Sequence, residues 1–131
     1  MSDRRSARGP TPVDVLAAAI ALQDHAKQVL EQIPGVSLTP LHSSMLIEVS
    51  RYPGANVAAR ARRLGKLHGN VSYVIKELVK QGLVENADPN KMSARHRLTE
   101  EGERILGEAQ KALSPLVGTK EFNLLKGLAN G

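Results

Sequence analysis

Hydrophobic and polar positions follow the helical period most clearly in residues 66–84. Four aliphatic residues fall at i, i+3, i+4 and i+7, which is one apolar stripe of an α-helix: Val71, Val74, Ile75 and Leu78. A second stripe lies on a different face, carries one aromatic and no acid, and consists of Gly69, Ser72, Tyr73, Lys76 and Lys80. The pattern predicts a helix that a core holds on one side and that is free on the other side to contact an anionic partner.

Capping signals and apolar periodicity predict the other elements. A side chain that can cap a helix precedes each apolar stretch, at Thr11, Thr39, Asn56, Thr99 and Thr119. The predicted helices cover residues 12–33, 40–51 and 57–64. Another long helix starts after Thr99 and is ended by Pro115 or Gly118, and a final segment follows Thr119. Residues 83–85 and 95–98 predict two short strands, and the turn sequence Asp88-Pro89-Asn90 between them makes a hairpin.

The helix over residues 66–82 begins without a conventional cap. Gly65 permits a sharp turn before it, and Gly82 ends it at the position after its C-terminus. Two readings of its start are open. Either Leu67 fills an apolar position and His68 is a poor cap, or Leu67 itself begins the helix.

Composition restricts the core and the location of the protein. The 131 residues include one Phe, two Tyr and no Trp, so the core must be aliphatic. Cysteine is absent, which excludes disulfides, thiolate metal sites and thiol redox sensing. No apolar run could span a bilayer, and the N-terminus lacks the hydrophobic core of a signal peptide. We therefore expect a cytoplasmic protein.

Positive charge is concentrated around the central helix. The formal charge of the chain is +5, and residues 56–82 contain six basic residues against Glu77 alone. Such concentration favours a polyanionic partner, with affinity that comes largely from counterion release.

Neither catalysis nor metal binding is indicated. The four histidines have no metal-ligand spacing and no cysteine to join them. There is no GxSxG sequence, no Gly-rich phosphate loop and no acid pair on a plausible cleft. We expect a protein that is not an enzyme, with no catalytic residues, metal or cofactor.

The order helix, helix, tight turn, helix, short hairpin, helix predicts a winged helix-turn-helix. Residues 37–108 carry a set of short sequences in this order: LTP, YPG, ARRLG, GLV, DP and LTEEG. This ordered set resembles the MarR family of winged helix-turn-helix transcription regulators. The resemblance implies a mainly α fold with a small β-hairpin wing, and a homodimer whose recognition helices enter successive major grooves of the DNA.

The resemblance also implies a domain organisation. Residues 1–10 are expected to be a flexible basic arm, and residues 11–131 a single MarR-like domain. Within it, residues 37–99 form the winged helix-turn-helix, and residues 11–36 and 100–131 form the dimerisation helices. Two departures from the family stand out. Arg60 replaces a usually apolar residue, so we expect it to snorkel out of the core or to contact a phosphate. Ser43 replaces a common bulky residue, which would widen the space beneath its helix.

The expected DNA contacts lie on the recognition helix, because residues near its N-terminus reach base edges. They are His68, Gly69, Asn70, Ser72, Tyr73 and Lys76, among which Asn suits an adenine edge and Lys suits guanine or phosphate. Arg62 and Arg63 are assigned either to phosphates or to salt bridges. In the wing, Lys91 and Arg95 either enter or flank the minor groove, or are simply solvated.

The sequence therefore predicts a sequence-specific double-stranded DNA-binding transcriptional regulator, a homodimeric repressor on a pseudo-palindromic site. Two alternatives are a sequence-tolerant, chromosome-organising DNA-binding protein and a winged-helix protein-interaction module without DNA binding. Relatives in the resembling family often bind small aromatic acids between the dimer helices and the DNA-binding lobe. His25, His42, Ser43 and Arg51 either line such a cleft or are surface and structural residues, and the effector is unknown.

Overall fold

The computed structural model describes residues 9–87 and 95–130, without the side chains of residues 128–130. Its elements, in chain order, are α2 (Pro12–Leu30), α3 (Pro40–Arg51), α4 (Val57–Leu64), α5 (His68–Lys80), β1 (Val84–Asn86), β2 (His96–Leu98), α6 (Glu100–Leu113), the 3₁₀ helix η1 (Ser114–Gly118) and α7 (Lys120–Asn130). The strands pair antiparallel, with Val84 opposite Leu98. No helix in the described ranges is long and apolar enough to cross a membrane.

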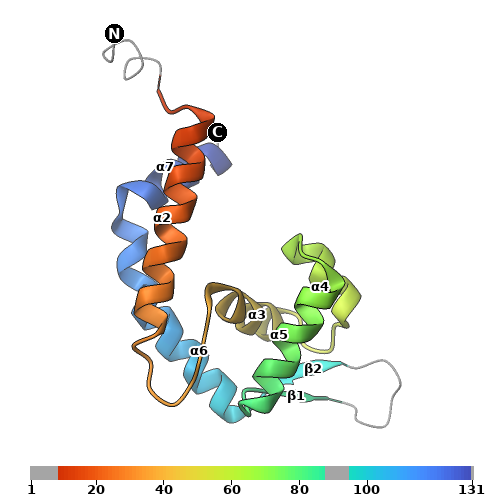
Figure 1. Ribbon diagram of the computed structural model, residues 1–131. Coiled ribbons are helices and arrows are strands. Elements are labelled where there is room, and N and C mark those ends of the chain that lie inside the picture. Colours follow the sequence, from red (N-terminus) through yellow and green to blue (C-terminus); the bar gives the residue numbers. More distant parts are fainter. Residues whose placement is uncertain (1–8, 88–94, 131) are drawn as a thin grey trace.

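The elements form a lobe and an arm (Figure 1). The lobe contains α3, α4, α5 and the two strands, and the arm contains α2 and α7 side by side. Helix α6 begins beside the strands and runs into the arm, so that one helix belongs to both parts. This is the mainly α, winged helix-turn-helix arrangement that the sequence predicts.

All five predicted caps are present with the expected geometry. The side-chain oxygens of Thr11, Thr39, Asn56 and Thr99 accept from the backbone N–H three residues later. Thr119 accepts in the same way from the Phe122 N–H, at 3.2 Å. The end of α2 falls at Leu30, earlier than expected, because i→i−3 bonds tighten the chain over the next residues. The capping residues therefore predict the first residue of each of these helices.

The start of α5 differs from both readings of the sequence. Leu67 is the N-cap, with φ −70° and ψ 144°, and the helix begins at His68. Leu67 therefore neither fills an apolar position nor begins the helix, and both alternatives are wrong. The physical reason lies in the end of α4. Gly65 takes φ 63° and the Lys66 N–H bonds the Ala61 carbonyl at 3.0 Å, so the chain reaches Leu67 outside the core.

The core is aliphatic and joins the lobe to the arm. Its fully buried side chains come from α2, α3, α5, Leu83 and Val84 at the start of β1, and α6. The base of the wing lies directly against α6 at Gly102. A Cβ added to Gly102 would overlap the Leu83 carbonyl oxygen and lie 2.9 Å from its carbon. The Thr99 N–H also bonds that oxygen, at 3.0 Å, so β1 and the first turn of α6 are held together.

Candidate nucleic-acid interface

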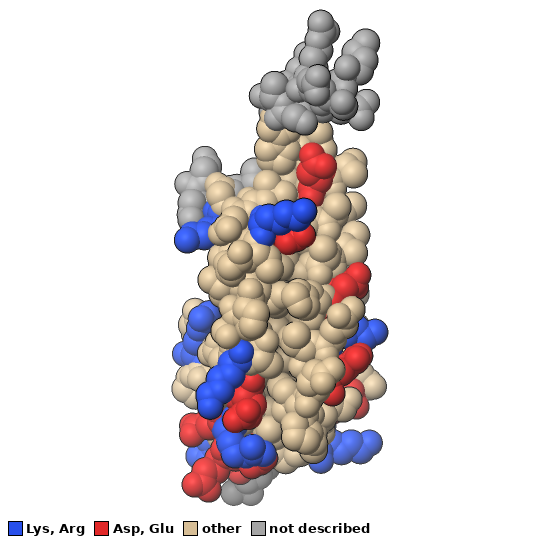
Figure 2. Space-filling view, turned by 90° about the vertical axis from the view of Figure 1, so that its left-hand side faces the viewer, with Lys and Arg blue, Asp and Glu red and all other residues tan. Residues whose placement is uncertain are grey.

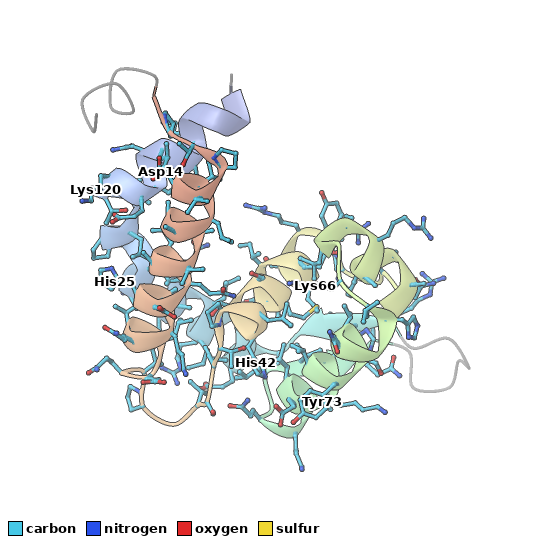
Figure 3. All side chains as sticks on the ribbon, turned by 45° about the horizontal axis from the view of Figure 1, so that its top comes forward. Asp14, His25, His42, Lys66, Tyr73 and Lys120 are labelled. Carbon is cyan, nitrogen blue, oxygen red and sulfur yellow. The ribbon has the colours of Figure 1, made fainter. Side chains whose placement is uncertain are left out.

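Helix α5 presents the two faces that the sequence predicts. The side chains of Val71, Val74, Ile75 and Leu78 are buried. On the other side Asn70, Tyr73 and Lys76 are exposed, and Tyr73 is 63% exposed (Figure 3). Ser72 is half-buried between the two faces. A rigid helix, anchored from behind, thus carries an amide, a phenol and an ammonium group toward solvent.

The N-terminal end of α5 is open. His68 and Gly69 are exposed, and a Cβ on Gly69 would meet nothing within 4 Å. No side chain caps the helix, so the positive end of its dipole faces outward. Uncapped N–H groups at a helix start suit an anion such as a phosphate. The acid of this helix, Glu77, is half-buried and lies 3.4 Å from His42 Nε2.

The two arginines of α4 lie in different environments. Arg62 is exposed, and no ion pair is found for it within the described residues. Arg63 bonds Glu48 through Nε at 2.7 Å and Nη2 at 2.6 Å, and its guanidinium lies 3.9 Å above the Tyr52 ring. Its bond to Glu48 raises the pKa of Arg63. The sequence assigned Arg63 either to a phosphate contact or to a salt bridge, and the structure contains the salt bridge.

Arg60 is completely buried, so the expectation that it snorkels out or meets a phosphate is wrong. Its Nη1 donates to the Glu48 carbonyl at 3.3 Å and its Nη2 to the His96 carbonyl at 3.2 Å. The Glu48 carboxylate lies 3.6 Å away. Burial lowers the pKa of Arg60, an effect that Glu48 opposes. The two carbonyls and the carboxylate provide the polar partners that water would provide at the surface. The Arg60 side chain thereby connects α4 with α3 and β2.

The wing is described only at its base. Arg95 donates from Nη1 to the Gly54 carbonyl at 2.9 Å, which joins the wing to the end of α3. Arg97 pairs with Glu85 across the strands at 2.8 Å. His96 is buried, and its pKa is lowered first by burial and then by Arg60. Lys91 lies outside the described residues. So do residues 1–8, which are most of the basic N-terminal segment predicted over residues 1–10.

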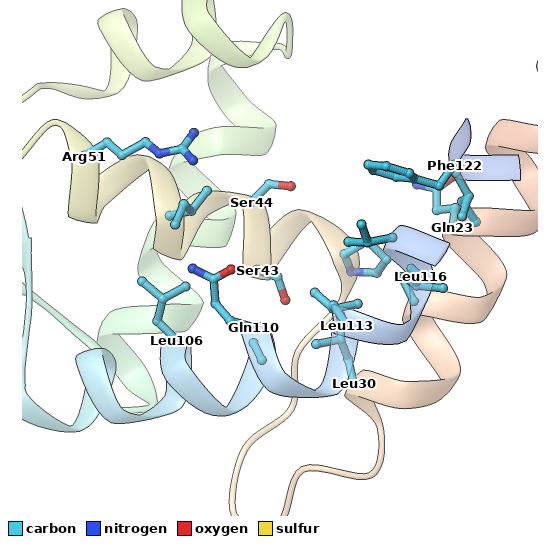
Figure 4. A pocket seen from close by; sticks show the side chains of 16 residues that line it. Gln23, Leu30, Ser43, Ser44, Arg51, Leu106, Gln110, Leu113, Leu116 and Phe122 are labelled. Carbon is cyan, nitrogen blue, oxygen red and sulfur yellow. The ribbon is translucent and has the colours of Figure 1, made fainter. Parts of the chain in front are cut away.

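A cavity of about 450 Å³ opens between the lobe and the arm. Figure 4 shows polar groups on two sides of it: Arg51, Ser43, Ser44 and Gln110 come from α3 and α6, and Gln23 comes from α2. Apolar side chains complete it, among them Leu30, Leu113, Leu116 and Phe122. Of the four residues considered for an effector cleft, Ser43 and Arg51 line this cavity and the two histidines do not. His42 instead completes the Thr39 cap, accepting its N–H at 3.1 Å.

The arm has an exposed apolar surface. On α2, Val13, Leu16 and Ile20 are 73%, 60% and 50% exposed. The middle of the side seen in Figure 2 is largely uncharged, and charged side chains lie above it, below it and along its margins. A surface of this kind on a helical arm is typical of a protein–protein interface.

Comparison with known proteins identifies a family for part of the chain. The model of the MarR family matches residues 36–91. The transcriptional repressor CouR, solved with a 23-mer DNA duplex, is 24% identical over 92% of this chain and 91% of that one, with a TM-score of 0.75. CouR bound to p-coumaroyl-CoA gives 25% identity over 90% and 79%, and a TM-score of 0.67.

Two further solved structures have the same fold. Wild-type MarR from E. coli is 17% identical, covering 93% of this chain and 96% of that one, with a TM-score of 0.72. A MarR family protein of Mycobacterium tuberculosis, in complex with salicylic acid, is 20% identical over 83% and 81%, with a TM-score of 0.64. A comparison with curated proteins gives no significant match. The resemblance seen in the sequence is thereby confirmed.

The sequence does not single out Glu48, and it gives Arg60 and Leu67 roles other than those in the structure. Glu48 and Arg60 form the buried ion pair of the lobe. A signal was present, because Arg60 falls on the inward stripe of α4 with Val57, Ala61 and Leu64, but its partner on another helix could not be identified. The third residue, Leu67, is 75% exposed next to the predicted DNA contacts.

Proposed function

We propose, from the match of residues 36–91 to the model of the MarR family, that the protein is a homodimeric repressor that binds a specific double-stranded DNA site. The observation that carries the proposal is the exposed face of α5. Asn70, Tyr73 and Lys76 extend from a helix whose other face is buried. No acid is exposed beside them on that helix. A protein that binds chromosomal DNA acts in the cytoplasm, at the nucleoid.

In the proposed complex α5 lies in the major groove. Asn70 is suited to an adenine edge and Lys76 to a guanine or a phosphate. Gly69 lets the backbone approach closely, and the uncapped N-terminus of α5 with His68 faces a phosphate. Ser72 and Tyr73 complete this surface, and Arg62 contacts the flanking backbone. Arg95 supports the wing from Gly54, and Lys91 is proposed to meet the minor groove.

The proposed dimer uses the arm. Residues 11–36 and 100–131 are the proposed dimerisation segments, and the exposed apolar residues of α2 supply a surface that a partner would cover. Two copies related by a twofold axis place two α5 helices on one side, which matches a pseudo-palindromic site. The solved complex of CouR with a DNA duplex supports this arrangement by likeness of fold.

Selection of bound sequences from a random duplex pool tests this proposal. We expect a pseudo-palindrome whose half-sites are one helical turn apart, and a preference over random duplex of about a thousandfold or more. Lys76→Ala should weaken binding to the selected site and reduce the slope of log affinity against log salt by about one. Lys111→Ala is the matched control, because Lys111 is an exposed lysine on α6.

The alternatives predict other outcomes of the same experiment. A chromosome-organising protein would bind all duplexes with similar affinity, and the pool would give no shared sequence. A protein-interaction module would bind no duplex tightly, and Asn70→Ala and Lys76→Ala would change nothing. Either result would overturn the proposal of a specific repressor.

We further propose that the cavity between lobe and arm takes the effector, an aromatic carboxylate. Its volume of about 450 Å³ suits a small ligand, and its lining is mostly apolar with a few polar groups. The Arg51 guanidinium points into it from α3 (Figure 4) and could pair with a carboxylate. Salicylic acid, found with one protein of this fold, supports an aromatic carboxylate, and p-coumaroyl-CoA, found with another, supports an aromatic group in such a cavity although it is a thioester.

A thermal-shift titration with salicylate tests the effector site. Salicylate should raise the melting temperature of the wild-type protein and lower its affinity for the selected duplex. Arg51→Met should remove most of the salicylate effect, because the carboxylate loses its cationic partner. Arg104→Met is the control, since Arg104 pairs with Glu101 on the surface of α6. Equal shifts in the wild type and Arg51→Met would contradict the assignment of Arg51.

A further inference from the structure

Leu67 is the most exposed large hydrophobic residue among those the structure describes, at 75%. It occupies the N-cap of α5, directly before the residues proposed to contact DNA. Its own neighbours Lys66, His68 and Gly69 are also exposed. A leucine here therefore packs against little of the fold, and its role must be sought outside the core.

Leucine is a poor choice for this position on structural grounds alone. Helices α2, α3, α4 and α6 are all capped by a Thr or Asn side chain, whereas α5 has no side-chain cap bond. Serine, threonine, asparagine or aspartate would supply one, and apolar residues rank far below them at an N-cap. The exposed side chain also gains almost nothing from burial. A residue that is unfavourable at an N-cap and gains no burial there is typical of a functional position.

The side chain is nevertheless presented by a rigid backbone. Before it, Gly65 takes φ 63° and the Lys66 N–H bonds the Ala61 carbonyl at 3.0 Å. After it, the Val71 N–H bonds the Leu67 carbonyl at 3.1 Å. The backbone of Leu67 is thus fixed by a hydrogen bond to α4 just before it and by one within α5 just after it.

The surroundings indicate what this side chain would meet. The first residues of a recognition helix reach base edges in the major groove. Gly69 adds no side chain there, and the space around its Cα is open. In the major groove the base-edge group complementary to an aliphatic side chain is the 5-methyl of thymine. Lysine and histidine on either side favour the phosphate backbone that borders the same groove.

We propose that Leu67 is a specificity-determining residue that contacts the 5-methyl group of a thymine in each half-site. The inference rests on the proposed function, because it requires α5 to lie in the major groove. It adds a base contact that polar residues cannot make: Asn70 and Lys76 read hydrogen-bonding groups, and Leu67 reads a methyl.

The test replaces each thymine of the selected duplex with deoxyuridine, one symmetry-related pair at a time. This change removes the 5-methyl alone and leaves pairing intact. Fluorescence anisotropy should show one pair of positions at which wild-type affinity falls about fourfold per half-site, the value of one buried carbon group. At that pair Leu67→Ser should bind the thymine and deoxyuridine duplexes equally.

Leu67→Ser is chosen because serine can cap α5, so the variant should fold at least as well as the wild type. Val79→Ser is the control, since Val79 is an exposed apolar residue later on α5, and it should keep the wild-type sensitivity. Affinity insensitive to every deoxyuridine, or equal sensitivity in the wild type and Leu67→Ser, would overturn the inference while leaving the proposed function standing. Failure of the pool to yield any bound duplex would overturn both.

Discussion

Replacing Glu48 with alanine is expected to lower the free energy of unfolding by about 3–5 kcal/mol. The Glu48 carboxylate is 5% exposed and lies between two guanidinium groups, those of Arg63 and Arg60. Without it, Arg60 remains fully buried with two backbone carbonyls as its only partners in the described residues. Urea denaturation followed by circular dichroism measures the loss.

A matched control separates the effect of burying an ion pair from the effect of the ion pair itself. Glu85 also pairs with an arginine, Arg97, but both side chains are about half exposed. Glu85→Ala should therefore cost less than about 1 kcal/mol. The double variant Glu48→Leu with Arg60→Met should recover much of the loss from Glu48→Ala, because no buried charge is left without a partner. A Glu48→Ala protein as stable as the wild type would contradict the role given to this pair.

Gly102→Ala is expected to destabilise the protein by roughly 2–3 kcal/mol, although alanine is ordinarily the better helix former. The new Cβ would occupy the place of the Leu83 carbonyl, which is backbone and can move only with β1. The Thr99 N–H bond to that carbonyl would be lost in the movement. Since β1 leads into the wing, affinity for the selected duplex should fall together with stability.

Gly107 provides the comparison on the same helix. A Cβ added there would meet nothing within 4 Å, so Gly107→Ala should stabilise the protein by about 1 kcal/mol. The two variants make the same chemical change in α6, and only their surroundings differ. Opposite signs in the denaturation midpoint are the expected result. A Gly102→Ala midpoint at or above the wild-type value would show that β1 does not pack against α6 as described.

Local signals in the sequence are sufficient to locate most of the fold. Thr39 followed by Pro40 marks the start of α3, because a capping hydroxyl and a proline both act within one turn. Gly82 marks the end of α5 for a similar reason, since its φ of 77° suits a residue without a side chain. The order of these elements, together with the short sequences between them, carries the resemblance to the MarR family.

Contacts between distant segments could not be foreseen in this way. The burial of Arg60 depends on carbonyls supplied by α3 and β2, which periodicity along α4 does not report. The exposure of Leu67 depends on how α4 ends and not on the apolar pattern of α5. Arg51 faces the cavity because α6 and η1 pass close to α3. Each of these outcomes is a property of the packing, and each lies where the proposed site or its support is built.

The buried pair of Glu48 and Arg60 also constrains how this lobe can change over evolutionary time. Loss of Glu48 first leaves the buried Arg60 cation without its carboxylate. Loss of Arg60 first leaves the Glu48 and His96 carbonyls without their shared donor. A lineage with apolar residues at both positions is separated from this one by an intermediate that is less stable than either. We therefore expect Glu48 on α3 and Arg60 on α4 to change together, although they lie 12 positions apart in the chain.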